Sequence, residues 1–327
     1  MSEPFSIVKA AEIMLDCKEQ PWLIDHLWST EAVGVLGGPP KSCKSWLGLD
    51  LSVSIASKTP CLGTFTVTRA GPALVYMAED ALPAVRERIQ ALCRHRSLPL
   101  QDLDLFCIDA PAVRLDHPDH RNRLEQTIQK LDPRFLLLDP FVRLHRADEN
   151  SAQEMSSILG FLRELQRRFH LAVALVHHTS KKHHSQPGRA LRGSSDIHAW
   201  TDSSLFLLRK GNSLILTVEH RSAPAPQPMV LKLVVGAHNT TTHLDVVRNW
   251  TEPEKHSQTL DTSLIELLTT AQEPLTRHII RQRLKVKNQT LGVALAELEH
   301  KGIIYREKTG WILTAGQTNG HEKGGLP

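Results

Sequence analysis

The chain has 327 residues, a hydrophobic fraction of 41% and a formal net charge of +4, which allows one large α/β domain and a small second unit. No apolar run reaches the roughly 18 to 20 residues of a membrane span, and the acidic, interrupted N-terminal segment does not resemble a signal peptide. We therefore expect a cytoplasmic protein with no membrane partner. The five cysteines contain no C-x-x-C pair, so the pattern predicts neither a disulfide framework nor a zinc site.

Short runs of branched apolar residues alternate with helical patterns through most of the chain. This alternation is typical of βαβ units around a parallel sheet, so the predicted fold class is α/β. Three strand-like runs after Trp200 are separated by turn residues and predict antiparallel strands that finish the sheet. Strands are expected over 33–36, 73–77, 105–109, 135–138, 171–176, 204–210, 213–220 and 229–235, and helices over 44–57, 81–94 and 151–169.

Composition also suggests where the domains end. The main domain is expected over 1–250, with 1–30 as a lead-in, and the polar, helix-poor stretch 251–258 is the predicted linker. A small unit over 259–314 follows. The tail 315–327 has almost no apolar residues to bury and is predicted to be disordered.

The stretch GGPPKSCKSW, 37–46, differs at one position from the phosphate-binding pattern G-x-x-x-x-G-K-[ST]. Such a loop needs backbone N–H groups that surround an anion, a lysine for the β- and γ-phosphates and a hydroxyl for Mg²⁺, all at a helix N-terminus. Cys43 stands where the pattern has glycine, at a strain of about 1–2 kcal/mol. A loop that binds nothing is the alternative. The candidate nucleotide-binding residues are Gly38, Pro39, Pro40, Lys41, Ser42, Cys43, Lys44, Ser45 and Trp46.

Three further strand-like runs end in polar residues, at the edge where open α/β sheets bind ligands. Glu79, with Asp80 beside it, follows one run, and a carboxylate there could polarise an attacking water. Asp139 ends a second run, where a carboxylate would support Mg²⁺ together with Ser45. His177 and His178 end a third. Each residue alone has an ordinary structural explanation, but together they favour an ATP- and Mg²⁺-dependent site.

The succession GGPPKSCKSW, VYMAED, LLLDP, ALVHHTSK and LRGSS resembles the RecA-type P-loop ATPases of the hexameric plasmid replicative helicase RepA group, over roughly 21–233. The resemblance implies a RecA-like core in which Lys44 and Ser45 bind phosphate and Mg²⁺, Glu79 is the catalytic base, and His178 senses phosphate. The helicases also carry an arginine that reaches a neighbouring subunit, where this chain has none. Arg221 is the substitute candidate, and an exposed hairpin arginine is the alternative.

The stretch 177–192 is basic and nearly free of apolar residues, which predicts a mobile loop at the same sheet edge. In ring-forming relatives this loop faces the central channel. Lys181, Lys182, Arg189 and Arg192 are the candidate DNA contacts, and a purely solvated loop is the alternative. The loop has no aromatic residue for base stacking, which argues against strong single-strand binding by the loop alone.

The unit over 259–314 reads as three amphipathic helices and a hairpin with Thr309 and Gly310 at its tip, the order of a winged helix. Winged helices bind DNA with the third helix and the wing, but they also serve as protein-binding modules. The helicase resemblance does not extend to this unit. The candidate DNA-binding residues are Lys285, Lys287, Gln289, Arg306 and Lys308.

The sequence thus predicts an ATP-hydrolysing RecA-like ring ATPase, expected as a hexamer, that acts on DNA as a replicative-helicase-like motor of a plasmid or other mobile element. Two alternatives stay open. One is a nucleotide-switched DNA-binding regulator or loader that does not translocate. The other is a pseudo-ATPase scaffold whose phosphate loop is inactive.

Overall fold

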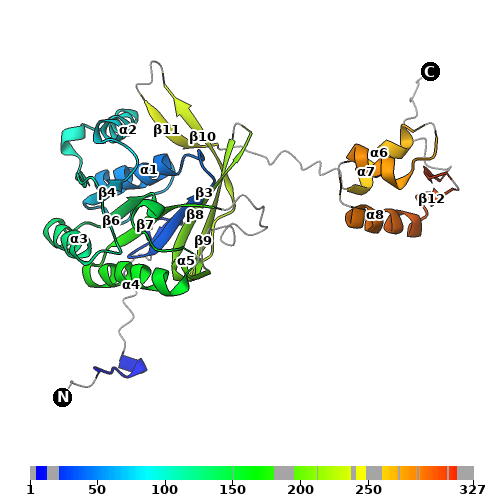
Figure 1. The fold of residues 1–327 in the computed structure, drawn as a ribbon. Coiled ribbons are helices and arrows are strands. Elements are labelled where there is room, and N and C mark those ends of the chain that lie inside the picture. The colour runs from blue at the N-terminus through cyan, green and yellow to red at the C-terminus, as the bar shows by residue number, and fades with distance from the viewer. Residues whose placement is uncertain are drawn as a thin grey trace. The chain divides into compact units, whose positions relative to one another are not determined.

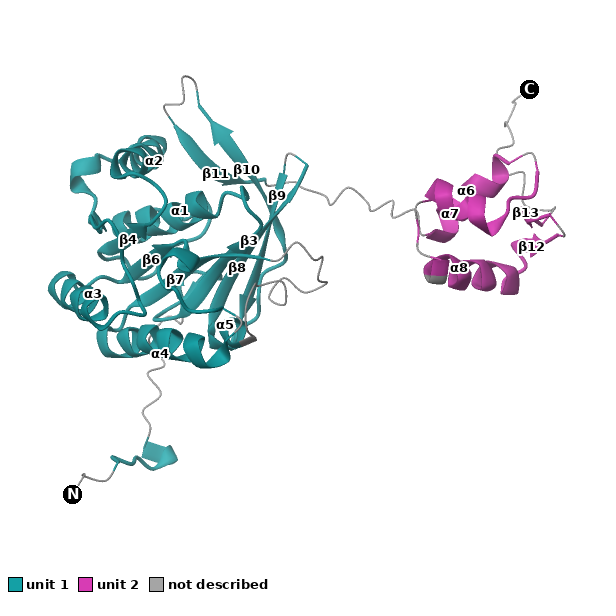
Figure 2. Ribbon diagram, in the orientation of Figure 1, with its two compact units in different colours: residues 1–248 teal, residues 249–327 magenta. Residues whose placement is uncertain are grey.

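The computed structural model describes residues 5–12, 22–149, 151–179, 195–211, 213–236, 241–247, 260–271, 273–284, 286, 288–307 and 309–314. The chain separates into two compact units, 1–248 and 249–327, coloured separately in Figure 2. The first unit has two buried apolar clusters and the second has one of its own, and each unit is described by itself.

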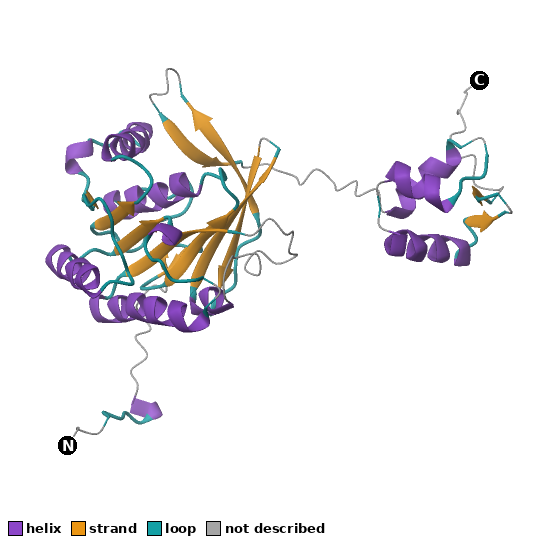
Figure 3. Cartoon of the chain, viewed as in Figure 1, coloured by secondary structure: helices purple, strands orange, loops and turns teal. Residues whose placement is uncertain are grey.

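The first unit is built on one nine-stranded sheet in the order β11-β10-β9-β8-β3-β7-β6-β4-β5 (Figures 1 and 3). Strands β3 to β8 run parallel to one another, and β9, β10 and β11 continue the sheet antiparallel. The mainly parallel α/β sheet predicted from the sequence is therefore confirmed. The strands are β3 (Val33–Gly38), β4 (Ala73–Met77), β5 (Leu105–Cys107), β6 (Phe135–Asp139), β7 (Ala172–His178), β8 (Ser203–Lys210), β9 (Ser213–His220), β10 (Met229–Val235) and β11 (Thr242–Val246).

Helices cover both faces of this sheet, because its central strands are apolar on both sides. In β6, Phe135 and Leu137 face one apolar cluster, whereas Leu136 and Leu138 face the other. Helices α1 and α2 pack on the first face, and α3, α4 and α5 on the second (Figure 1). The helices are α1 (Lys44–Ser57), α2 (Leu82–His95), α3 (Pro118–Leu131), α4 (Ala152–Phe169) and α5 (Ser195–Trp200), with 3₁₀ turns η1 (Ala10–Glu12), η2 (Leu100–Asp102) and η3 (Phe141–Arg143).

Several elements were not predicted from the sequence, helix α3 and strand β11 among them. Helix α3 buries only Leu124 and Ile128, a stripe too narrow to be recognised against its polar background. Strand β11 pairs with β10 as the last strand of the sheet. The expected strand 105–109 is shorter than predicted and ends at Cys107.

The lead-in to the phosphate loop is part of the core. Strands β1 (Trp22–Ile24) and β2 (Trp28–Ser29) form a small antiparallel pair. The Trp28 side chain is fully buried, and its ring lies edge-on against Phe135 of β6, with 6.2 Å between ring centroids. Within the described part of the chain, no helix combines the length and apolarity that a membrane crossing requires.

The second unit contains three helices and a hairpin: α6 (Leu260–Thr269), α7 (Arg277–Leu284), α8 (Asn288–His300), β12 (Ile304–Arg306) and β13 (Trp311–Leu313). Its cluster includes Leu264, Leu268, Ile280, Leu295 and Leu298, so all three helices contribute. The segment between α6 and α7 also pairs with the hairpin, through two backbone hydrogen bonds of 3.0 and 2.8 Å between Leu275 and Trp311.

Candidate nucleotide-binding site

The carboxyl ends of four neighbouring strands meet at one edge of the sheet. Gly38, at the end of β3, lies opposite His178 at the end of β7. Asp139, at the end of β6, lies opposite Met77 of β4, and Glu79 follows two residues later. The parallel register thus brings the predicted phosphate loop and three of the predicted polar strand ends to the same edge.

The loop between β3 and α1 has the backbone of an anion-binding turn. Lys41 and Cys43 are both left-handed, with φ of 62° and 64°, and alternation of such residues turns successive N–H groups toward one concavity. Helix α1 begins directly at Lys44, so its N-terminal dipole points at the same place. A Cβ at Gly38 would lie 2.4 Å from the Leu207 carbonyl oxygen, so only glycine fits there. Trp46 packs against the core beneath the loop.

Arg209 of β8 contacts two residues of this turn. Its Nη2 lies 3.4 Å from the Cys43 sulfur, and its Nε donates to the Lys41 carbonyl oxygen at 3.3 Å. The two residues that carry left-handed backbone are therefore held by one guanidinium. Cys43 adopts the conformation that the consensus glycine supplies, at the cost of placing a Cβ in it.

We expect Cys43→Gly to raise the free energy of unfolding by about 1 kcal/mol, because glycine occupies the left-handed region without steric strain. The loop already has the required backbone, so ATP affinity should change less than tenfold. Thermal denaturation and titration with a fluorescent ATP analogue measure the two quantities. Cys43→Ala is the matched control, since it keeps the Cβ and should gain no stability. A large gain in affinity for Cys43→Gly alone would indicate an inactive loop.

Lys44 is buried and faces inward. Its Nζ donates to the carbonyl oxygens of Gly38 at 3.0 Å and Pro39 at 2.9 Å, and lies 3.3 Å from His178 Nδ1. Burial lowers the pKa of Lys44 to about 8, and the nearby Asp139 carboxylate partly opposes this shift. Because a charged ammonium group only donates, Nδ1 of His178 must accept, so the neutral ring carries its hydrogen on Nε2. This tautomer carries an N–H group, which is the kind of donor that can bind phosphate.

Ser45 and Asp139 form a candidate Mg²⁺ site. The Ser45 hydroxyl lies near enough to the Asp139 carboxylate to oppose the rise in its pKa. Oδ2 of Asp139 is buried and has no hydrogen-bond partner among the described residues. A hydroxyl and a buried carboxylate oxygen are the hard oxygen ligands that Mg²⁺ prefers, so the residues present fit this ion.

Burial raises the pKa of Asp139 to about 6, and the nearby Asp80 and Glu79 carboxylates add to the shift, while Ser45 and Lys44 oppose it. An acid whose pKa rises on folding stabilises the fold below its unfolded pKa, near 3.8, and that contribution is lost as the pH rises through about 6. We expect Asp139→Asn, in EDTA and without nucleotide, to be more stable than wild type at pH 7 by about 1–3 kcal/mol. The gain should disappear near pH 4. Denaturation at several pH values measures it, with exposed Asp104→Asn as the control.

Two arginines hold the acidic pair after β4, and no sequence motif pointed to either. Nε of Arg143, in η3, donates to Oε1 of Glu79 at 2.7 Å. Both terminal nitrogens of Arg88, in α2, donate to Asp80, at 2.7 and 2.9 Å. The proposed catalytic base is therefore ion-paired.

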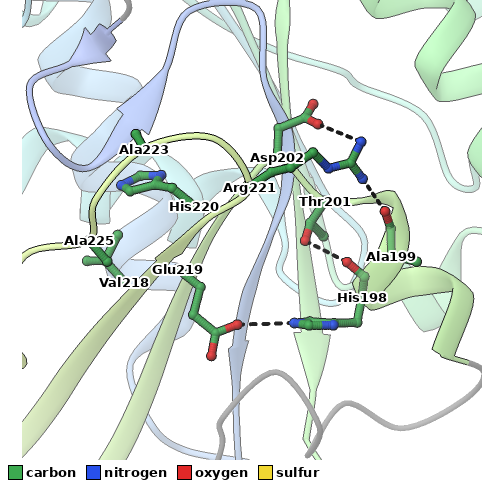
Figure 4. A pocket seen from close by; sticks show the side chains of 10 residues that line it. All are labelled: His198, Ala199, Thr201, Asp202, Val218, Glu219, His220, Arg221, Ala223 and Ala225. Atoms are coloured by element: carbon green, nitrogen blue, oxygen red, sulfur yellow. Dashed lines mark hydrogen bonds and ion pairs between the residues drawn. The ribbon is translucent and has the colours of Figure 1, made fainter.

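Arg221 lies at the other end of the strands from the phosphate loop, near the residues where β3 begins. Ser203 pairs with Gly34 near the start of β3 and with His220 of β9, so Arg221 follows β9 at the edge where β3 begins. Its Nη2 donates to the Ala199 carbonyl oxygen, and its Nη1 lies 3.5 Å from Asp202 (Figure 4). These contacts place Arg221 against α5, far along the sheet from the phosphate loop of its own chain.

Arg221 lines a pocket of about 560 Å³. Asp202 is also ion-paired with Arg163 of α4 and accepts a hydrogen bond from Val33 N. Arg221 is the second arginine that contacts the Asp202 carboxylate. Its side chain is half exposed and lines the pocket. Across the pocket His198 and Glu219 form a pair at 3.1 Å (Figure 4). The lining is His198, Ala199, Thr201, Asp202, Val218, Glu219, His220, Arg221, Ala223 and Ala225.

The predicted DNA contacts are mostly beyond what the structure describes. Gln289 lies in α8, and the described residues include its backbone only. Arg306 lies in β12 of the second unit and is exposed. Outside the described residues are Lys181, Lys182, Arg189, Arg192, Lys285, Lys287 and Lys308, together with the predicted linker 251–258 and tail 315–327.

A protein-family model matches the part of the chain that carries this site. The model of an AAA domain family, AAA_25, matches residues 2–184, which include the phosphate loop, Glu79, Asp139 and His178. The chain belongs to this AAA domain family, and the matched residues lie in its first unit. Among solved structures, a crystal structure of the RadB recombinase is similar with a TM-score of 0.49 and 14% sequence identity, over 67% of this chain and 92% of that one.

Proposed function

We propose that the chain is a Mg²⁺-dependent ATPase that acts on DNA as a ring, expected to be a hexamer, in the replication of a plasmid or other mobile element. The observation that carries this proposal is the grouping of Lys44, the Ser45–Asp139 pair and His178 at one sheet edge, with Glu79 beside them. Phosphate binding, metal binding and water activation each have a candidate residue there.

In the proposed mechanism, the backbone N–H groups of 41–45 and the Lys44 ammonium bind the β- and γ-phosphates. Mg²⁺ held by Ser45 and Asp139 would neutralise charge on the phosphate oxygens. Glu79 orients and polarises water for in-line attack on the γ-phosphate. His178, fixed beside Lys44, donates to the γ-phosphate and reports its loss to β7.

Arg221 supports assembly into a ring. Because it lies at the edge where β3 begins, it would serve the phosphate site of a neighbouring copy rather than its own. Its hydrogen bond to Ala199 supports this role, because Ala199 belongs to the segment that corresponds, in the resemblance to the RepA helicases, to the one with the arginine that reaches a neighbour. A guanidinium beside the γ-phosphate stabilises charge in the transition state.

The second unit supports a DNA-binding role. We propose that this unit is a winged helix, and its three helices, its two-stranded hairpin and the Leu275–Trp311 pairing support the proposal. We propose α8 and the hairpin as its DNA-binding elements, with Arg306 exposed on the hairpin. The same unit favours the alternative of a nucleotide-switched regulator or loader that binds DNA without moving along it.

The test is ATP hydrolysis by the full-length protein with and without single-stranded DNA, combined with unwinding of a forked duplex. DNA-stimulated turnover with ATP-dependent unwinding supports the motor. Stimulated turnover and tight DNA binding without unwinding support the regulator. Absence of ATP binding supports the scaffold and contradicts the proposal. Sedimentation with and without ATP measures whether the active species is a ring-sized oligomer.

A further inference from the structure

The proposed catalytic base is engaged by an arginine that the ATPase motifs do not include. Arg143 Nε lies 2.7 Å from Glu79 Oε1, and the two side chains are 64% and 50% exposed. Arg143 belongs to η3, which follows the Mg²⁺-binding end of β6, so the contact joins the segments after β6 and β4. The ion pair therefore lies at the sheet edge that carries the candidate nucleotide-binding site.

The backbone that presents Arg143 is fixed on both sides. Nη1 of Arg114 donates to the Arg143 carbonyl oxygen at 2.8 Å, and Leu115 N donates to the Leu144 carbonyl oxygen at 2.6 Å. Phe141 and Leu144 are fully buried on either side of the arginine. Since the turn is anchored, the entropic cost of the ion pair comes mainly from the rotamer freedom of the two side chains.

The ion pair engages the carboxylate that the proposed mechanism needs for water. The same contact occupies an oxygen that a water molecule would otherwise use. We propose that Arg143 is a positioning residue that restrains Glu79, so that water activation requires release of this ion pair. The inference rests on the proposed function, in which Glu79 is the base.

Comparison with the neighbouring acid shows why this contact is suited to release. Asp80 is held by two hydrogen bonds from Arg88, and both side chains are only 28% exposed. Glu79 is held by one nitrogen of a more exposed arginine. Exposed pairs of the second kind shift an equilibrium by only about two- to fivefold. The Glu79–Arg143 pair is thus weak enough to open during each turnover.

The test is steady-state ATP hydrolysis by full-length Arg143→Ala without DNA. We expect kcat to rise about two- to fivefold, with KM changed less than twofold, because the restraint acts on the base and not on ATP binding. Arg143→Lys keeps the charge but not the guanidinium geometry, so its kcat should lie between those of wild type and Arg143→Ala. Arg168→Ala is the matched control: its pair with Glu125 is also exposed, at 2.6 Å, and kcat should not change.

Salt provides a second readout that a purely structural role would not give. Exposed ion pairs are screened as ionic strength rises, so the ratio of the Arg143→Ala rate to the wild-type rate should approach one between about 0.05 and 0.5 M KCl. An unchanged or lower kcat for both Arg143 variants at low salt, with KM preserved, would overturn the inference. Full activity of Glu79→Gln, or no ATP binding by wild type, would contradict the proposed function instead.

Discussion

Lys44→Ala is expected to reduce ATP hydrolysis by roughly 10²–10³-fold, the usual effect of removing one preorganised charge-stabilising donor. The lysine is buried, and its Nζ is already directed by the Gly38 and Pro39 carbonyl oxygens and by His178. These three groups engage all three donors of the ammonium, so contact with a phosphate exchanges at least one of these hydrogen bonds for one to a phosphate oxygen. Initial-rate assays at saturating ATP measure the loss.

The control for this variant is Lys58→Ala. Lys58 caps the other end of helix α1 and is exposed, so the same substitution should leave the rate within a factor of about two. Lys44→Ala also removes the free-energy cost of burying a charged lysine. We therefore expect Lys44→Ala to unfold at a higher temperature than wild type. Turnover in Lys44→Ala close to that of wild type would mean that the hydrolysis comes from a different site or protein.

Arg221→Ala is expected to lower kcat by about 10³-fold or more, which is the scale of a trans-acting arginine. ATP binding should be preserved, since Arg221 lies at the opposite edge from its own phosphate loop. An arginine that only anchors the turn after β9 to α5 would instead lower stability and leave kcat unchanged. Hydrolysis, analogue binding and thermal denaturation together distinguish these outcomes.

A mixing experiment tests whether Arg221 acts on a neighbouring copy. Arg221→Ala subunits keep the phosphate loop, and Lys44→Ala subunits keep Arg221, so a mixed ring contains some complete interfaces. Two inactive proteins should therefore regain part of the wild-type rate when mixed, and neither should do so alone. A mixture that stays inactive while it co-assembles would show that Arg221 does not complete a neighbour's site.

The sheet edge could be predicted because it depends on local patterns. Parallel strands buried on both faces are nearly continuous apolar runs, and the polar residue at the end of each run marks the edge. Helix α1 has the predicted bounds, 44–57, and β7 ends at His178. The helices of the second unit could also be predicted from their amphipathic periodicity, and its hairpin from the turn residues at its tip.

The arginines around the site could not be predicted in the same way. Arg143 contacts Glu79 across 64 positions of sequence, and Arg209 contacts Cys43 across 166. Exposed arginines are common, and neither position carries a local signal. Only the packing of β8 beside β3, and of the turn after β6 beside the end of β4, brings these charges to the site.

Cys43 has a consequence for how phosphate loops are recognised in other chains. Its left-handed backbone is maintained by the helix that follows and by Arg209, not by the freedom of glycine. Any residue that tolerates this backbone region, asparagine or aspartate included, could occupy the position, whereas valine, isoleucine and threonine would be strongly disfavoured. A search that insists on glycine before the lysine passes over such ATPases, and a search that requires a compatible backbone retains them.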